Sequence, residues 1–384
     1  MIAVIYFIFS LFSLFILFRN WQKDTPKRFK LKERRISQKT ITAKRTVEIW
    51  GKAAVGLYLW QHIFEARLDN INGELEKYGE IQFDKIIIKF RTGMLITPES
   101  IDRDTKNAIL VINGREPNKI KFARKWLDSL TAINSLENFG VLLLGNEQCD
   151  NDWLMPYMIN RGGIIKFAFI IYDIPYADGK LFHSWPLGVA TYRNFPVTHN
   201  NAITTEKRKY LCNFIGTIYK SSSREELMKI INANEDMKNS CFLHVRNDWV
   251  PHETKESSEI FYNALKNSEL TLCPVGKNTE CYRIYEAISL GSVPVVEDVM
   301  TPGRCGKSVA ENSKQIPLRI LKKFNAPVIY VKDWKELPQI ITKEKMLSEQ
   351  FVLKRRQNLL MWYQKFKYEL RNMFLKQLKT GFNF

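Results

Sequence analysis

The chain has 384 residues, of which 45% are hydrophobic and 26% are charged, and its formal net charge is +18 at pH 7. This length allows two domains that each bury a core, and the composition is ordinary for a globular protein, which excludes a wholly disordered chain. The six cysteines form no C-x-x-C pair, so a zinc cluster is not expected. Their even number permits disulfides, whose pairing the sequence leaves open.

The first residues form an apolar segment. Residues 2–18 are interrupted only by Ser10 and Ser13, and at about 1.5 Å per residue they extend about 25 Å, the short end of the range for a membrane helix. A charged segment does not precede this stretch and an A-x-A site does not follow it, which disfavours a cleaved signal peptide. Residues 1–18 are therefore predicted to be an uncleaved transmembrane signal anchor.

The segment after the anchor is strongly basic. Residues 19–45 hold eleven Lys and Arg residues against Asp24 and Glu33. Because this segment has few aromatic residues and follows a membrane segment, we interpret it as a solvated stem or a lipid-headgroup contact and expect no nucleic-acid partner. The positive-inside rule alone would place such a flank, and the body of the protein, in the cytoplasm.

Residues 46–205 have the pattern of a first α/β domain. The tryptophan-containing amphipathic pattern of residues 47–64 predicts a helix. Apolar runs then alternate with a helical pattern, which predicts strands at 84–90, 108–112, 140–144 and 164–172 and a helix at 118–134. This alternation favours a parallel sheet that is covered on both faces.

Residues 206–335 repeat the alternation, and the polar segment 199–209 is the expected linker. The pattern predicts strands at 211–218, 242–245, 270–273, 293–296 and 328–331 and helices at 222–232, 256–267 and 317–324. Two consecutive series of this kind predict two Rossmann-like domains.

Residues 336–384 are predicted to be mainly helical, with a long basic helix at 343–379. Large apolar residues recur every four positions along it, with Tyr363 beside them: Trp362, Phe366, Leu370, Phe374 and Leu378. Such a stripe is typical of a helix that packs against its own protein.

Segment 270–299 has the pattern of a strand, a glycine turn, a helix and a second strand. The apolar run 270–273 ends at a turn that contains Gly276, and the β-branched run 293–296 forms the second strand. The segment is therefore predicted to be a βαβ unit with parallel strands.

The helix of this unit carries two candidate ligand-binding residues. Asn278 or Thr279 is the expected helix cap, and Gly291 is expected to end the helix. Arg283 and Glu286 are three residues apart and so share one face. An arginine at a helix N-terminus can hold a diphosphate, and a glutamate one turn later can accept two hydrogen bonds from a ribose diol. The alternative is an ordinary surface ion pair.

The segment also resembles the donor-site signature of exostosin-type glycosyltransferases, family 47. The matching positions are C-P-x-G, Arg283, Glu286-Ala287, Gly291 and Pro294-Val295-Val296. Further similar blocks lie at 47–64, 111–116, 142–151, 185–197 and 210–219, so that the likeness extends from about residue 47 to residue 370. The resemblance implies a GT-B-like fold, in which two Rossmann-like domains enclose a cleft and the C-terminal helix packs back on the first domain.

The resemblance also implies a function. We expect an inverting transferase that moves xylose from UDP-xylose to ribitol 5-phosphate on the O-mannosyl glycan of α-dystroglycan. It implies a single-pass type II protein of the Golgi membrane with a lumenal body, and other glycosyltransferases of the same pathway as partners. The alternatives are an exostosin-like transferase that uses another UDP-sugar on heparan-type chains, and a catalytically silent Golgi scaffold.

In a GT-B enzyme the donor is held mainly by the second domain, which suggests further binding residues. The turn at Gly276 should contact the donor, and Arg246, at the end of the 242–245 strand, is a second candidate for the diphosphate. Gly216 would let the backbone approach the donor, with a strand bulge as the alternative. Arg115 could meet an anionic acceptor, with a surface role as the alternative.

Transfer with inversion needs a general base from the first domain. Glu147 and Asp150 follow the 140–144 strand, and Asp173 ends another strand. Each of these three acidic residues has a loop cap or a surface charge as its alternative role, and the sequence does not choose among them.

A metal site is not expected. The two D-x-D strings, 102–104 and 150–152, are short enough to arise by chance, and GT-B enzymes use cationic side chains and helix dipoles at the diphosphate. The five histidines show no metal-ligand spacing. We therefore expect no obligatory cofactor or metal, with the UDP-sugar as a substrate.

Overall fold

The computed structural model describes residues 44–73, 75–172, 174, 177–198, 207–246, 248, 250, 253–305 and 316–384. Residues 44–384 form one unit, and all that follows concerns this unit. The predicted anchor at 1–18 and nearly all of the predicted stem at 19–45 lie outside the described residues. Within the described part of the chain, no helix is long and apolar enough to cross a bilayer.

The first sheet has eight strands, in the order β2-β3-β4-β1-β5-β6-β7-β8. Their bounds are β1 Arg45–Gly51, β2 Asp69–Asn70, β3 Glu76–Phe83, β4 Ile86–Gly93, β5 Asn107–Asn113, β6 Asn138–Leu144, β7 Ile165–Ile171 and β8 Phe182–Trp185. Strands β4, β1, β5, β6, β7 and β8 run parallel, as predicted, but β3 is antiparallel to both β4 and β2. The prediction of a wholly parallel sheet is wrong at this edge, because a tight turn at Asp84, with a positive φ of 53°, joins β3 and β4 as a hairpin.

The prediction of one helix at 47–64 is wrong in its first part, where β1 stands. Val47, Ile49 and Trp50 are all fully buried, because β1 lies in the interior of the sheet and is covered on both faces. Burial on both faces removes the alternation of polar and apolar residues that marks a strand at an exposed sheet. The helical part begins later, with α2 (Val55–Leu57) and a π-helical segment at Tyr58–Ile63.

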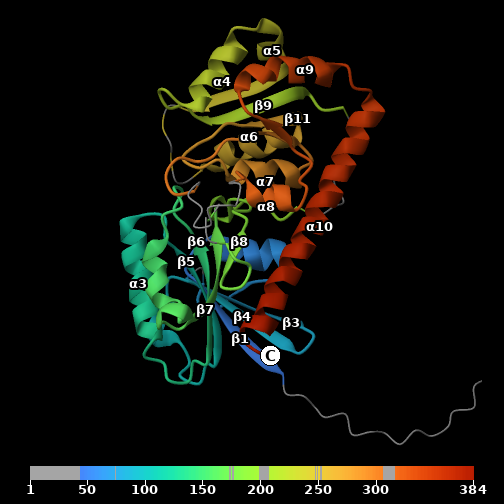
Figure 1. Cartoon of the computed structure of the whole chain (residues 1–384). Coiled ribbons are helices and arrows are strands. Elements are labelled where there is room, and N and C mark those ends of the chain that lie inside the picture. Colours follow the sequence, from blue (N-terminus) through green and yellow to red (C-terminus); the bar gives the residue numbers. More distant parts are fainter. Residues whose placement is uncertain are drawn as a thin grey trace, which may run out of the picture. The chain divides into compact units, whose positions relative to one another are not determined.

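Two helices cover the two faces of this sheet (Figure 1). Helix α3 (Pro117–Leu130) buries Trp126 and Leu127 in a cluster with Leu110 and Leu143 on one face. The opposite face packs in a second cluster that includes the C-terminal helix α10 (Glu349–Gly381). Helix α3 lies at its predicted position, 118–134, but ends at Leu130, and the strands β2, β3 and β8 were not predicted.

The second sheet has five strands, all parallel, in the order β10-β9-β11-β12-β13. Their bounds are β9 Tyr210–Thr217, β10 Cys241–Arg246, β11 Ser268–Cys273, β12 Val293–Glu297 and β13 Ile329–Val331. The helices are α4 Ser223–Asn232, α5 Glu235–Ser240, α6 Lys255–Lys266, α7 Tyr282–Ser289, α8 Arg319–Lys323 and α9 Leu337–Lys345. Each strand and helix predicted between residues 211 and 331 is confirmed, and α5 is the one described helix of this region without a prediction.

The predicted helix at 343–379 is two helices, α9 and α10. Helix α9 ends at Lys345, and Ser348 caps α10, since its hydroxyl accepts a hydrogen bond from the Phe351 N–H. Four of the five residues of the predicted apolar stripe are buried in α10, and the fifth, Trp362, is half-buried. The Phe374 ring lies 5.3 Å from the Phe169 ring of the first sheet, and Phe366 lies 6.2 Å from Tyr285 of α7. Helix α10 therefore contacts elements of both sheets (Figure 1).

Short 3-10 helices complete the described elements, at Pro98–Ser100, Asp152–Tyr157, Ile159–Arg161, Thr191–Arg193 and Trp334–Glu336. The first sheet ends at Trp185 and the second begins at Tyr210, so the predicted boundary at residue 205 falls in the connection between them. Residues 199–206 of that connection lie outside the described residues. The fold is mixed α/β with largely parallel sheets.

Candidate functional site

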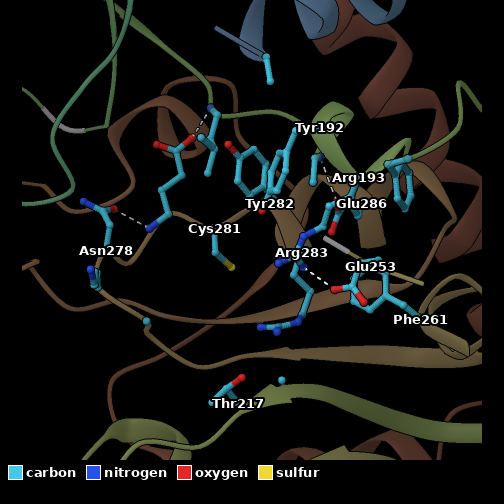
Figure 2. Close-up of a pocket in the computed structure, with 18 of the residues that line it drawn as sticks. Tyr192, Arg193, Thr217, Glu253, Phe261, Asn278, Cys281, Tyr282, Arg283 and Glu286 are labelled. Carbon is cyan, nitrogen blue, oxygen red and sulfur yellow. Dashed lines mark hydrogen bonds and ion pairs between the residues drawn. The ribbon is translucent and has the colours of Figure 1, made fainter. Parts of the chain in front are cut away.

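A pocket of about 920 Å³ lies where the carboxyl ends of strands from both sheets meet (Figure 2). Ligands of open parallel sheets bind at this end of the strands, where the loops converge. Seven of the predicted site residues line the pocket: Arg115, Glu147, Gly216, Arg246, Gly276, Arg283 and Glu286. The connection between the sheets supplies further lining residues, among them Ala190, Tyr192 and Arg193.

Arg283 occupies the first turn of α7 and points its guanidinium at the end of β9. Its Nη2 donates to the Ile215 carbonyl at 2.6 Å, and the guanidinium lies 5.3 Å from the centre of the Phe214 ring. Its Nε and Nη1 are buried and have no hydrogen-bond partner among the described residues. Buried donors without partners indicate a missing water or ligand, and on a guanidinium they favour an anion.

Arg224, which the sequence analysis missed, stands beside Arg283. It lies in the first turn of α4, after the cap Ser222, and its Nη1 donates to the Thr217 carbonyl at 2.8 Å. Its Nε is buried and has no hydrogen-bond partner among the residues that the structure describes. Burial, and next to it the charge of Arg283, lower the pKa of Arg224. The signal in the sequence was an arginine two residues after a serine cap, following a predicted strand.

The two predicted glycines make room for these two arginines. A Cβ at Gly216 would lie 3.0 Å from Nη2 of Arg283, and a Cβ at Gly276 would lie 2.8 Å from Nη2 of Arg224. Gly216 pairs regularly with Val245 of β10, so the alternative of a strand bulge does not apply there. The glycines thus allow a pair of guanidinium groups to approach the strand ends closely.

Glu286 lies one turn after Arg283 on α7 and is almost fully buried at the pocket. Its Oε1 accepts a hydrogen bond from the Ala190 N–H at 3.0 Å. Burial raises the pKa of Glu286 to about 7, against the lowering effects of the Ala190 N–H and of Arg283. The Glu286 side chain lines the pocket, and no described residue forms a hydrogen bond with its Oε2.

The start of α7 differs from the prediction. The cap position is Cys281, and neither Asn278 nor Thr279 caps the helix. Both polar side chains are used elsewhere: Asn278 Nδ2 donates to the Glu147 carbonyl at 2.6 Å, and the Thr279 hydroxyl donates to the Val299 carbonyl at 2.9 Å. The prediction was wrong because these side chains bind distant segments rather than the helix that follows them.

Cys281 also brings a thiol to the pocket. It is half-buried, lines the pocket, and remains a free cysteine together with the buried Cys273. A hydrogen bond with Cys273, and the charges of Arg283 and Arg224, lower the pKa of Cys281. The lowered pKa is a further sign that this part of the pocket favours negative charge.

The wall formed by the first sheet carries an ion pair. Arg115 follows β5 and Glu147 follows β6, and Arg115 Nη2 lies 2.5 Å from Glu147 Oε1. Asn146 Nδ2 donates to the Arg115 carbonyl at 3.0 Å, which fixes the two loops to one another. The two predicted residues therefore neutralise one another at the pocket.

A second ion-pair cluster borders the pocket on the β10 side. Arg246 ends β10 as predicted, and its Nη1 lies 2.5 Å from Glu253 Oε1. Arg193 of the connection lies 2.8 Å from the same oxygen. Figure 2 shows Arg193 and Glu253 next to one another at the pocket, close to Glu286. Two arginines share one carboxylate, which leaves this cluster with a net positive charge.

Of the other two base candidates, the structure describes only Asp150, which does not line the pocket. The Asp150 carboxylate is largely exposed and lies 3.5 Å from Nη1 of Arg304, which also pairs with Asp152. Asp173 lies outside the described residues. Among the described residues, no group of three or more His, Cys, Asp or Glu side chains is arranged to hold a metal ion.

Comparison with known protein families matches nearly the whole described unit. Residues 47–186 match the family described as the RXYLT1 N-terminal domain, and residues 192–383 match the RXYLT1 C-terminal domain. Curated proteins named ribitol-5-phosphate xylosyltransferase 1 are similar to the chain. Those of Danio rerio and Homo sapiens are 47% identical over 341 and 342 residues, which cover 88% of this chain and 77% and 76% of those proteins.

Solved structures are similar only at a low level. A structure titled crystal structure of GtfA/B complex has a TM-score of 0.41 and 8% identity, over 83% of this chain and 70% of that chain. The catalytic domain of starch synthase IV from Arabidopsis thaliana bound to ADP and acarbose has a TM-score of 0.38 and 9% identity, over 88% and 100%. Likeness at this level carries no argument about the chain.

Proposed function

The chain belongs to the ribitol-5-phosphate xylosyltransferase 1 family, and we propose on this basis that it transfers xylose from UDP-xylose to a ribitol 5-phosphate acceptor. The acceptor unit would be carried on the O-mannosyl glycan of α-dystroglycan. A single observation in the structure supports the proposal most strongly: a pocket whose second-sheet wall presents two arginines without carboxylate partners among the described residues.

The donor half of the site is formed by the second sheet. Arg283 and Arg224 would bind the diphosphate of UDP-xylose through the donors that have no partner among the described residues. Both arginines lie in first turns of helices, α7 and α4, where the helix dipole also favours negative charge. The diphosphate leaves the anomeric carbon with an extra negative charge, which these groups would stabilise in the transition state.

Glu286 would bind the ribose of the donor. Its Oε2 is free to accept a hydrogen bond from a ribose hydroxyl, while its Oε1 stays fixed on the Ala190 N–H. Replacing Glu286 by Ala should weaken UDP binding about tenfold, as expected for loss of a hydrogen bond to a charged group. Titration calorimetry with UDP measures this, and an unchanged affinity in a folded variant would reject the ribose role.

Glu147 is the general base that we propose for the acceptor. Its carboxylate would take the proton of the attacking ribitol hydroxyl while that oxygen bonds to the anomeric carbon and the bond to UDP breaks. Arg115, 2.5 Å from Glu147, orients the carboxylate. Glu147 lines the pocket, whereas Asp150 is exposed and paired with Arg304, which supports Glu147 over Asp150.

The phosphate of the acceptor requires a cation of its own. Arg193 and Arg246 share one carboxylate at the pocket, so their cluster retains a positive charge. The net charge of +18 also favours an anionic donor and an anionic acceptor on approach.

We also propose the GT-B-like arrangement and the Golgi location that the sequence resemblance implies. Two largely parallel sheets with a pocket at their carboxyl ends support the former. Two disulfides, which persist in oxidising compartments, support a lumenal body. Protease protection on intact vesicles tests the location: digestion of the body without detergent would place it in the cytoplasm.

A transfer assay tests the activity directly. Purified protein is incubated with a ribitol 5-phosphate glycan acceptor and one donor in each parallel reaction: UDP-xylose, UDP-glucose, UDP-glucuronic acid or UDP-N-acetylglucosamine. The mass of the product is then measured by mass spectrometry. The proposal expects a mass gain of one pentose with UDP-xylose. Transfer of another sugar to heparan-type oligosaccharides instead would support an exostosin-like transferase of other specificity. Tight UDP binding without any transfer would support a silent scaffold.

A further inference from the structure

Two loops from opposite sheets are joined covalently at the edge of the pocket. The loop after β6 carries Cys149, and the segment after β12 carries Cys305; these two cysteines form a disulfide across a sequence separation of 156 residues. Their Cα atoms lie 4.8 Å apart. The bond thus connects the first-sheet wall of the pocket to the second-sheet wall, which are far apart in sequence.

Hydrogen bonds on either side of the disulfide bring the same two walls together. The Arg304 N–H donates to the Gln148 carbonyl at 2.9 Å, and Asn278 Nδ2 donates to the Glu147 carbonyl at 2.6 Å. A Cβ at Gly303, which has a φ of 101°, would lie 2.9 Å from Cβ of Gln148. The segments are therefore in close backbone contact, and a side chain larger than glycine at residue 303 would separate them.

The joined loop is the one that carries Glu147. Within the loop, the Cys149 N–H donates to the Asn146 carbonyl at 2.8 Å, and Asn151 Oδ1 accepts from the Asn146 N–H at 2.9 Å. Glu147 thus lies in a short turn whose end is held by the disulfide. Its carbonyl contacts Asn278 of the donor turn, and its carboxylate contacts Arg115.

We propose that the Cys149–Cys305 disulfide is a positioning clamp, which holds the Glu147 carboxylate at a fixed distance from the donor cradle formed by Arg283 and Arg224. This proposal rests on the proposed function, because it assigns Glu147 and the cradle to one reaction. Beside the disulfide, the loop of Glu147 is held to the second-sheet wall by the Asn278 and Arg304 hydrogen bonds and by the exposed Arg304 pairs with Asp150 and Asp152, and those exposed pairs contribute little. The two sheets stay packed elsewhere, through helix α10 and the Glu286–Ala190 hydrogen bond, so loss of the covalent bond should loosen this loop and leave the sheets together.

The second disulfide of the chain provides a matched control. Cys212 and Cys241 are directly opposed partners on the neighbouring strands β9 and β10, 29 residues apart in sequence. Neither of these two cysteines lines the pocket, and their bond stays within one sheet. Loss of either disulfide should lower stability, since each restricts the unfolded chain, but only loss of Cys149–Cys305 should change the geometry of the reaction.

The experiment compares the C149S/C305S and C212S/C241S double variants with the native protein, at a temperature where circular dichroism shows all three folded. For C149S/C305S we expect kcat to fall about 100-fold, the effect of a displacement of about 1 Å of a catalytic group. The Kd of UDP should stay within about threefold, because the donor cradle lies wholly on the second sheet. For C212S/C241S we expect a lower Tm and a kcat close to that of the native protein.

Hydrogen–deuterium exchange gives a readout that does not depend on activity. Residues 145–152 should exchange faster in C149S/C305S than in the native protein, and at the native rate in C212S/C241S. Two results would overturn the proposed clamp. One is a kcat of folded C149S/C305S within about threefold of the native value, and the other is unchanged exchange of residues 145–152. An absence of xylosyl transfer by the native protein rejects the proposed function instead, and the exchange comparison still decides the clamp.

A third measurement covers the case that C149S/C305S does not fold. Native protein is titrated with tris(2-carboxyethyl)phosphine, which supplies two electrons per disulfide to give two thiols, and mass spectrometry of alkylated peptides identifies the bond that has opened. The clamp predicts that transfer activity is lost in step with opening of Cys149–Cys305. Loss in step with Cys212–Cys241, or full activity after Cys149–Cys305 has opened, contradicts it.

Discussion

Arginines on the two walls of the pocket have different kinds of partner. On the second-sheet wall, Arg283 and Arg224 are held by the backbone carbonyls of Ile215 and Thr217, and buried guanidinium nitrogens of both have no partner in the described part of the chain. On the first-sheet wall, Arg115 is neutralised by Glu147 at 2.5 Å. A carbonyl orients a guanidinium without cancelling its charge, whereas a carboxylate cancels the charge.

This difference fits the proposal that the two walls serve the two halves of the reaction. An uncancelled pair of cations suits a diphosphate that gains negative charge as it leaves. A carboxylate that is oriented but still accessible at the pocket suits the removal of a proton from a hydroxyl. Variants on the first-sheet wall should therefore change kcat, whereas variants of the second-sheet arginines should change the affinity for UDP.

The largest effect is expected at the first-sheet wall, from Glu147→Gln. The amide keeps the shape of the side chain but cannot accept the proton, so kcat should fall about 10²- to 10⁴-fold while the Kd of UDP stays unchanged. Steady-state transfer kinetics and calorimetry measure the two quantities. Asp150→Asn, in the same loop but outside the pocket, is the control and should keep its kcat. A kcat of Glu147→Gln near the native value would break the assignment of the base.

The next largest effect is expected from Glu286→Gln, on the second-sheet wall. It concerns how the stability of the protein depends on pH. Because burial raises the pKa of Glu286 to about 7, the folded state binds more protons than the unfolded state between the ordinary glutamate pKa and pH 7. Stability of the unliganded native protein should then fall as pH rises through that window. Glu286→Gln should remove this loss, which amounts to at most about 3 kcal/mol at pH 8.

Urea denaturation of both proteins at pH 5 and pH 8, without UDP, tests this. The difference in free energy of unfolding between Glu286→Gln and the native protein should be larger at pH 8 than at pH 5. An equal difference at both pH values would mean that Glu286 does not titrate in this range in the folded protein.

A smaller effect is expected from Arg283→Ala on the second-sheet wall. Loss of charge-assisted hydrogen bonds should weaken UDP binding about ten- to hundredfold. The variant also frees the Ile215 carbonyl, so Arg283→Lys, which restores a positive charge without the planar fork, should recover part of the affinity. Calorimetry with UDP and with uridine separates the diphosphate from the nucleoside; an equal loss for uridine would argue against a diphosphate contact.

The smallest effect is expected from Arg224→Ala, about fivefold on the Kd of UDP. Among the described residues, Arg224 has one buried nitrogen without a partner and Arg283 has two, so more buried donors are left for the diphosphate on Arg283. Arg124→Ala on α3, outside this pocket, is the control. A loss larger than that of Arg283→Ala would reverse the order of the two arginines and make α4 the principal diphosphate site.

Features that neighbouring residues mark were predicted well, and features that depend on residues far away in the chain were not. The strands and helix of segment 270–299 were predicted with their bounds nearly correct, because apolar runs, glycines and a β-branched strand mark them locally. The strand β1 was taken for helix, because its burial on both faces left no alternation to detect. The cap of α7 was misassigned, because Asn278 binds Glu147, 131 residues away.

The sequence by itself determined that Arg283 and Glu286 lie on one face of a helix at the end of a parallel strand, since helical periodicity and strand pattern are properties of neighbouring residues. Only the tertiary structure decided that Arg224 stands beside Arg283, that Arg115 pairs with Glu147, and that Cys149 bonds Cys305. These are contacts between loops at the ends of different strands. Which loops meet depends on the order of strands in two sheets and on how the sheets face one another, and no local pattern encodes that order.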